Sequence, residues 1–198
     1  MATIGLSKPY AAKYNYDELT GKVTYSDGVL MGKLIEMTVE PEVTDDSNLY
    51  ADNGIVESVR AFTGGNVSIT TDHLTQEVSK MILGVTETEE TVDGIDEAVK
   101  VLSFDDDMTQ PELGFGDIIK TMKNGELVWR VMILPRVKFS IPAESATTQG
   151  ESIEWQTPEL SATLMKSQEG KHPWKKIADF KSEENAEKYI KNFLNILA

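Results

Sequence analysis

Apolar and polar residues alternate with a period of two along much of the chain, the spacing of strands that bury one face. The clearest run begins at Lys33 and ends at Glu40, where Pro41 interrupts the pattern. Its two sets of side chains are Ile35, Met37 and Val39 on one face and Glu36, Thr38 and Glu40 on the other. The sequence therefore predicts a strand with a core side and a polar side.

Further runs of this kind predict a mostly antiparallel sheet. Asn124-Gly125 separates two apolar-rich runs, 113–123 and 127–141, and this dipeptide is the strongest short-range signal of a hairpin. Strands are also expected over residues 55–62 and 152–164. Gly64-Gly65 predicts a hairpin turn immediately after the first of these.

Two segments have the period of a helix instead. Asp72 is expected to cap the first helix, which ends at Gly84, a residue suited to a left-handed C-terminal position. Ser182 is expected to cap the second, because glutamates follow it in the first turn, where the helix dipole favours acid. The apolar stripe of this second helix is Ala186, Tyr189, Ile190, Phe193 and Leu197.

These elements predict a mainly β (α+β) protein, an antiparallel β-sandwich or barrel-like fold with one central helix and one C-terminal helix. Residues 1–165 are expected to form the β domain, and residues 166–198 an extension that carries the amphipathic helix. Residues 1–8 have no clear pattern and are interpreted as an N-terminal arm. Residues 42–54 and 85–97 are interpreted as long polar loops, which are often functional or mobile.

Charge and composition narrow the function further. The chain has 33 acidic and 19 basic residues, a formal charge of −14, which argues against binding nucleic acid through its phosphates. It has no cysteine, so disulfide scaffolds and thiolate chemistry are excluded. No apolar run is long enough to span a membrane, and the N-terminus is not expected to be a secretory signal.

Candidate catalytic and metal-binding residues are few. His73 and His172 are the only histidines, and they do not form a ligand-spaced pair. The acidic run 105–107 lacks the ligand spacing, glycine and closing glutamate of a calcium loop. Glu36 and Glu40 have a spacing that glycoside hydrolysis can use, but a plain solvent-facing strand is the favoured interpretation. We therefore expect neither an enzyme nor a cofactor.

Aromatic residues offer one more binding chemistry. Trp129, Trp155 and Trp174 could stack on sugars. Trp129 and Trp155 lie within apolar alternation, however, and are expected in the core.

Five segments, in order, resemble the major tail protein family of long-tailed phages, the subunits of the tail tube. They are MATIGL, LYADNGIVE, TTDHLTQEVSKMILG, RVKFSIP and SIEWQTPEL. The resemblance implies six-membered rings stacked into a tube through which DNA passes without specific binding. It also implies a virion protein of the tail, made in the host bacterial cytoplasm, whose partners are copies of itself and other tail proteins.

This resemblance directs attention to two sets of residues. The channel of such a tube needs a polar wall, and the expected lumen-facing residues are Glu36, Thr38, Glu40, Glu57 and Ser58. The strand 55–62 is expected beside the strand 33–40. The arm and the polar loop are expected to contact neighbouring subunits, through Thr3, Ile4, Leu6, Asp45, Asp46, Leu49 and Tyr50.

Two other functions fit the same sequence. The tube subunit of a secretion or contractile injection system has a similar fold, so fold alone does not separate it from a phage tube. A carbohydrate-binding β-sandwich of a tail or cell surface is the alternative from a different class.

Overall fold

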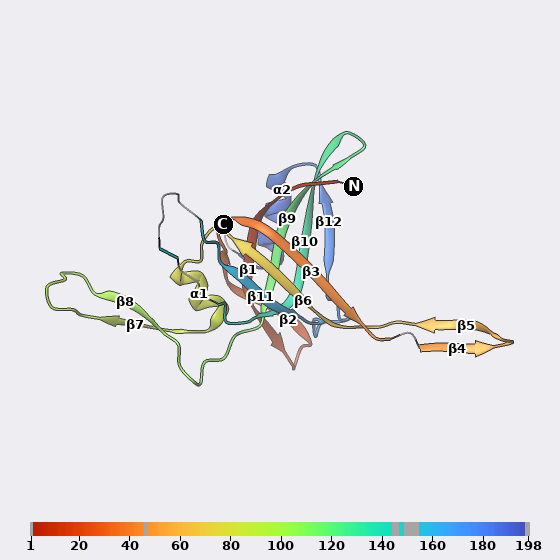
Figure 1. The fold of residues 1–198 in the computed structure, drawn as a ribbon, viewed down its shortest axis with the longest axis horizontal. Helices are drawn as coiled ribbons and strands as arrows, with labels where there is room; N and C mark the ends of the chain where they lie inside the picture. The colour runs from red at the N-terminus through yellow and green to blue at the C-terminus, as the bar shows by residue number, and fades with distance from the viewer. Residues whose placement is uncertain (1, 46, 144–146, 149–154, 197–198) are drawn as a thin grey trace.

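Strands make up most of the chain in the computed structural model, which describes residues 2–45, 47–143, 147–148 and 155–196 (Figure 1). The two helices are α1 (Gln76–Leu83) and α2 (Glu183–Phe193). The strands are β1 (Ala2–Asp17), β2 (Lys22–Leu30), β3 (Leu34–Val43), β4 (Ser47–Ala51), β5 (Gly54–Val59), β6 (Phe62–Thr71), β7 (Thr86–Glu90), β8 (Val99–Ser103), β9 (Leu113–Lys123), β10 (Glu126–Phe139), β11 (Glu159–Leu164) and β12 (Lys176–Phe180). The predicted fold class, mostly antiparallel β with a central and a C-terminal helix, is confirmed.

The main sheet has the order β2-β1-β9-β10-β11-β6-β3, and β12 also pairs with β10. The sheet folds into two layers, which we call leaves, and both layers contain part of β10. The first half of β10 pairs with β12, and its last residues pair with β11. Its register against β9 shifts between Leu134 and Val137, around Pro135, which has no N–H to donate. The first leaf is therefore β2, β1, β9, β10 and β12, and the second leaf is β11, β6 and β3 with the end of β10.

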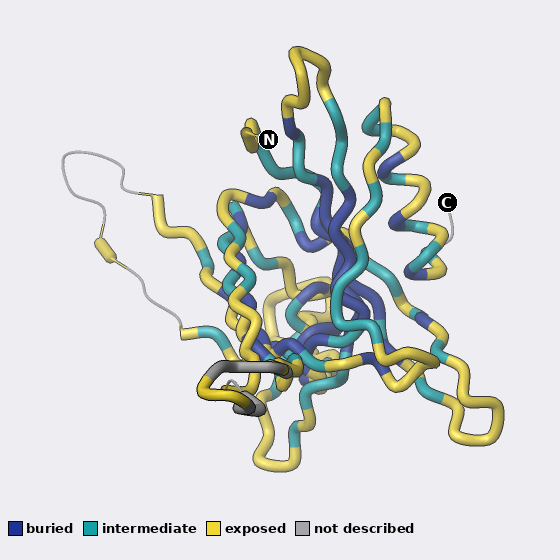
Figure 2. The backbone as a smooth tube through the Cα atoms, turned by 90° about the vertical axis from the view of Figure 1, so that its right-hand side faces the viewer, coloured by how far each residue is buried: buried dark blue, intermediate teal, exposed yellow. Residues whose placement is uncertain are grey.

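The structure has three layers, the second leaf, the first leaf and α2, and an apolar cluster lies at each of the two boundaries between them. The first lies between the leaves, where Phe115, Leu134 and Ile69 are fully buried. The second lies between the first leaf and α2, around Ile118, Ile133 and Ile190. Figure 2 shows the buried backbone concentrated in the body, with exposed residues at the projecting loops.

Glycines in β9 bring α2 close to the first leaf. A Cβ on Gly114 would lie 2.9 Å from Leu194 Cδ2, and one on Gly116 would lie 3.1 Å from Ile190 Cγ2. The Gly-Phe-Gly sequence thus serves helix packing, with the intervening Phe115 buried on the opposite side.

Local turn and cap signals predicted several boundaries correctly. Asn124 and Gly125 both have positive φ, 52° and 83°, as a two-residue hairpin turn between β9 and β10 requires. Gly84 ends α1 in the left-handed region, and Ser182 caps α2. The cap of α1 is Thr75, not Asp72, whose carboxylate instead accepts the backbone N–H of Lys33 at 2.8 Å.

The N-terminal residues are not a free arm. Strand β1 begins at Ala2 and pairs with β9, with register shifts after Thr3 and after Ser7. Leu6 packs against the first cluster. These two bulges break the period of two, which explains why the sequence pattern did not predict a strand here.

The polar segment after β3 is also structured. Strands β4 and β5 form a hairpin that turns at Asp52 and Asn53, both of which have positive φ. The expected turn at Gly64-Gly65 is wrong, because both glycines lie inside β6. A Cβ on Gly65 would lie 3.0 Å from Pro41 Cα, so this glycine permits the close approach of β3.

Three further expectations need correction. Residues 86–90 of the expected acidic loop form β7, which pairs with β8. Strand β12 was not predicted, although it joins residues of the expected C-terminal extension to β10. The last strand of the second leaf begins only at Glu159; residues 152–154, like Leu197 of the helical stripe, lie outside the described residues.

Candidate lumen face

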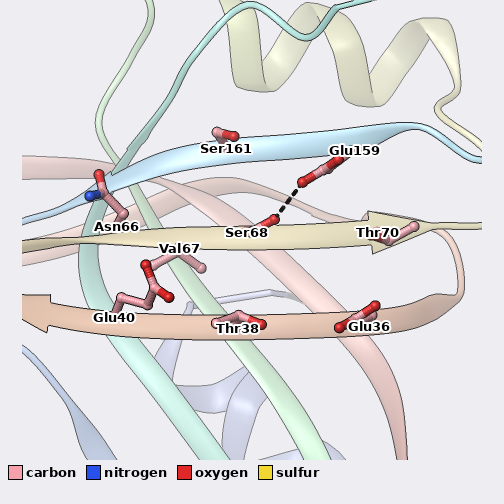
Figure 3. Close-up of a pocket in the computed structure, with 9 residues that line it drawn as sticks. All are labelled: Glu36, Thr38, Glu40, Asn66, Val67, Ser68, Thr70, Glu159 and Ser161. Atoms are coloured by element: carbon pink, nitrogen blue, oxygen red, sulfur yellow. Dashed lines mark hydrogen bonds between the residues drawn. The ribbon is translucent and has the colours of Figure 1, made fainter.

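The second leaf presents a continuous polar surface, which we call the polar face. Strand β6 lies between β3 and β11, and the register aligns polar residues in three cross-strand rows (Figure 3). The rows are Glu36–Thr70–Glu159, Thr38–Ser68–Ser161 and Glu40–Asn66–Thr163. Because each strand has a period of two, every member of these rows points to the same side of the leaf.

The opposite side of the same strands is apolar. Val67, Ile69 and Leu160 are at most 2% exposed, and Met37 and Val39 pack against them from the edge strand. This confirms the predicted two-sided strand, with one correction. Ile35 is 53% exposed, because the register shifts between Leu34 and Glu36 and Leu34 takes the buried position.

The polar face is acidic. Glu36, Glu40 and Glu159 are exposed, and β3, β6 and β11 contain no lysine or arginine. Ser68 donates a hydrogen bond to Glu159 at 3.0 Å, which holds that carboxylate against the strand. The basic residue Lys138 stands at the border of the face, opposite Thr163. The result is a hydroxyl-lined and carboxylate-lined surface that offers a phosphate backbone little positive charge.

Sequence reasoning identified one of the three strands of this face. Glu36, Thr38 and Glu40 come together as expected, but Glu57 and Ser58 do not join them. These two residues lie in β5, opposite Leu49 and Asn48 of β4, while the neighbour of β3 is β6. The missed residues of β6 and β11 also alternate polar with apolar, so the period of two was a signal that could have identified them.

The residues expected at subunit contacts fall on two parts of the structure. Thr3 and Ile4 are exposed on β1, with Ile4 51% exposed, whereas Leu6 is partly buried against the first cluster. Leu49 and Tyr50 lie in β4, Asp45 is exposed just before it, and Asp46 lies outside the described residues. Figure 1 shows the β4–β5 hairpin projecting far from the body of the chain. The contact of the expected residues with other subunits stays a prediction.

The other candidate sites have ordinary structural roles. His73 pairs with Asp72 at 2.8 Å, and His172 Nδ1 lies 3.0 Å from the carbonyl oxygen of Ser167. Among the described residues, no group of three or more His, Asp or Glu side chains is placed to hold a metal ion.

The tryptophans do not form a common platform for sugar stacking. Trp174 stacks on Phe62, with ring centroids 4.5 Å apart, and Trp129 packs against the second cluster. Trp155, expected in the core, is 85% exposed, because residues 155–158 do not belong to a strand.

No family model and no curated protein matches the chain. The structure defines the class, a mostly antiparallel β protein with a sandwich-like pair of leaves and two helices. Within the described residues, no helix is both long and apolar enough to cross a membrane.

Proposed function

We propose that this chain is the structural subunit of a phage tail tube, which assembles into stacked six-membered rings that conduct DNA. The observation that carries the proposal is the polar face, an acidic surface built from aligned rows on one side of a leaf whose other side is core. The same division is required of a tube wall, which must be apolar toward the subunit and polar toward the channel.

The chemistry of the polar face suits a conduit. DNA carries one negative charge per about 1.7 Å of its axis, and proteins hold it mainly by displacing counterions with lysine and arginine. Carboxylates at Glu36, Glu40 and Glu159 cannot do this. Because salt screens charges beyond about 8 Å, their repulsion acts only near the wall and does not obstruct the channel.

The edges of the second leaf support closure into a ring. Strand β3 is the last strand of its sheet, and in the described part of the chain β6 is the one strand that pairs with it. At the other edge, pairing of β10 with β9 ends at Val137. Lys138 and Phe139 pair with β11 and, among the described residues, with no strand on their other side. Pairing of β3 with this segment of the next copy would remove both exposed edges and repeat around a ring.

The projecting β4–β5 hairpin supports stacking. It lies between β3 and β6 in the chain and projects away from the body, so it can reach a neighbouring ring (Figure 1). In this proposal the protein belongs to the virion tail, its partners are its own copies and other tail proteins, and it has no catalytic role. A secretion-tube subunit would share the ring architecture.

The proposal predicts the effect of reversing charge on the polar face. The purified protein should form rings or tubes in negative-stain images. Glu36→Lys combined with Glu40→Lys should still assemble, because both side chains are exposed and outside the core. Tubes of the variant should retain short duplex DNA at low salt and release it as salt rises, because each new lysine can neutralise a phosphate.

A matched control makes the location testable. Glu18→Lys combined with Glu126→Lys adds the same charge at exposed sites away from the polar face. DNA retained inside a tube resists nuclease, whereas DNA on the outer surface is digested. Retained DNA that is equally nuclease-sensitive in both variants would show that the polar face does not line the channel. A persistent monomer under all assembly conditions would refute the tube itself.

A further inference from the structure

An apolar groove opens where β1, β2 and β3 meet, and we call it the β1–β3 groove. Leu6, Leu30 and Leu34 line it, with the lysines Lys8 and Lys33 at its margin. It exists because β2 stops at Leu30, opposite Tyr10. The first residues of β1 therefore pair with β9 on one side and, among the described residues, with no strand on the other side. Leu30 remains 47% exposed at the end of its strand, so the groove presents apolar surface to solvent.

The β7–β8 hairpin carries the opposite combination of features. Its strands pair only with each other among the described residues, from Thr86–Ser103 to Glu90–Val99, and the hairpin stands away from the main sheet (Figure 1). Beyond the last pair, its tip exposes Val92 and Ile95, which are 43% and 49% accessible. Acidic residues surround these two apolar side chains: Asp93, Asp96 and Glu97.

We propose that the β7–β8 tip of one copy docks in the β1–β3 groove of a second copy. Val92 and Ile95 match the leucines of the groove, and the acidic residues of the tip match the exposed Lys33. Lys8 already forms an ion pair with Glu187 at 2.6 Å, so Lys33, which is exposed, supplies the main attraction. This inference rests on the proposed function, because it names a contact that adjacent subunits of the tube use.

The geometry of this contact favours a closed or repeating assembly. Tip and groove are different surfaces, so each copy can give one contact and receive another, which generates rings or filaments rather than a symmetric pair. A single hairpin tip buries less than the roughly 1,200 Å² of a stable interface, so the contact acts together with others. Dilute protein is therefore expected to be monomeric, with docking apparent on assembly.

Cysteine cross-linking tests the contact directly, because the natural chain has no cysteine. One protein carries Ile95→Cys, and a second carries Leu30→Cys; both positions are about half exposed, so the fold should tolerate them. After mixing under assembly conditions and mild oxidation, we expect a covalent dimer that contains one chain of each kind. The control replaces Leu30→Cys with Leu19→Cys, at a side chain that is 99% exposed in the β1–β2 turn, and should give little dimer.

Substitutions measure how much the side chains at this contact contribute to the free energy of assembly. Ile95→Ser and Val92→Ser should each weaken assembly about tenfold, by removing a partly buried apolar contact, without changing the melting temperature of the monomer. Leu19→Ser should change neither quantity. Lys33→Glu should impair assembly, and mixing it with Asp96→Lys protein should restore mixed assemblies, because the charges at the contact are then exchanged.

The outcomes separate this inference from the proposed function. Rings or tubes that form without the Ile95–Leu30 cross-link overturn the docking and leave the tube proposal intact. A cross-linked dimer without rings or tubes supports the docking and overturns the tube. If neither cross-link nor assembly occurs, both are wrong.

Discussion

Asp117 carries a carboxyl group that is buried in the β-sandwich and has no hydrogen-bond partner in the described part of the chain. It lies in β9 opposite Met132, is 0% exposed, and shares its side of the strand with Phe115 in the first cluster. Among the described residues, neither carboxylate oxygen has a hydrogen-bond partner. Burial raises the pKa of Asp117 from 3.8 to about 8, although the positive charge of Lys175 acts in the opposite direction.

The raised pKa makes stability depend on pH. Below about pH 3.8 the carboxyl is protonated in both the folded and the unfolded chain, so its ionisation does not change the free energy of unfolding. Between pH 3.8 and about 8 the unfolded chain ionises while the folded chain keeps its proton, so the free energy of unfolding falls as pH rises. At about 1.4 kcal/mol per pH unit, this loss reaches about 4 kcal/mol at pH 7. Above pH 8 the folded group also ionises and the loss levels off.

Asp117→Asn should remove this dependence, because the amide has nearly the same shape and does not ionise. We expect the variant to be more stable than the natural protein by about 4 kcal/mol at pH 7, and by less than about 1 kcal/mol at pH 4. Urea unfolding of the monomer at several pH values between 4 and 8 measures both quantities. The control is Asp105→Asn in an exposed loop, where the side chain stays in solvent and no comparable change is expected.

The pH profiles decide the outcome. If Asp117→Asn and the natural protein lose stability in parallel between pH 4 and 8, Asp117 is not the buried acid responsible, and the reasoning fails. A gain that is equally large at pH 4 and pH 7 would point to improved packing instead of an avoided ionisation.

Two further predictions concern the attachment of α2. Ile190→Ala should lower the free energy of unfolding by about 2–5 kcal/mol in denaturant titrations, because Ile190 is fully buried against the first leaf; an unchanged midpoint would show that the helix is loosely held. Glu187 accepts hydrogen bonds from Lys8 and Tyr10, both at 2.6 Å, which lowers its pKa to about 2. Glu187→Gln should therefore cost about 1–2 kcal/mol near neutral pH. Because the pKa is lowered in the folded state, that difference should shrink as pH falls from about 4.5 toward 2, and a constant difference would contradict the assignment.

Local chemistry was the part of this protein that the sequence could determine. Asn124-Gly125 predicted its hairpin, and Ser182 predicted the start of α2, because turns and caps depend on residues a few positions apart. The alternation between Lys33 and Glu40 predicted which side chains share a face, with the single exception of Ile35 at a bulge. The acidic polar face could therefore be anticipated in part.

Tertiary structure alone decided which strands lie side by side. A period of two identifies the faces of a strand but not its neighbours, so residues 55–62 were expected beside β3, where β6 pairs instead. The row that joins Glu36 to Glu159 links residues far apart in the chain, and only the folded register brings them together. The burial of Asp117 has the same origin: its neighbours along the chain do not distinguish it from a surface aspartate, and the packing of the two leaves excludes it from water.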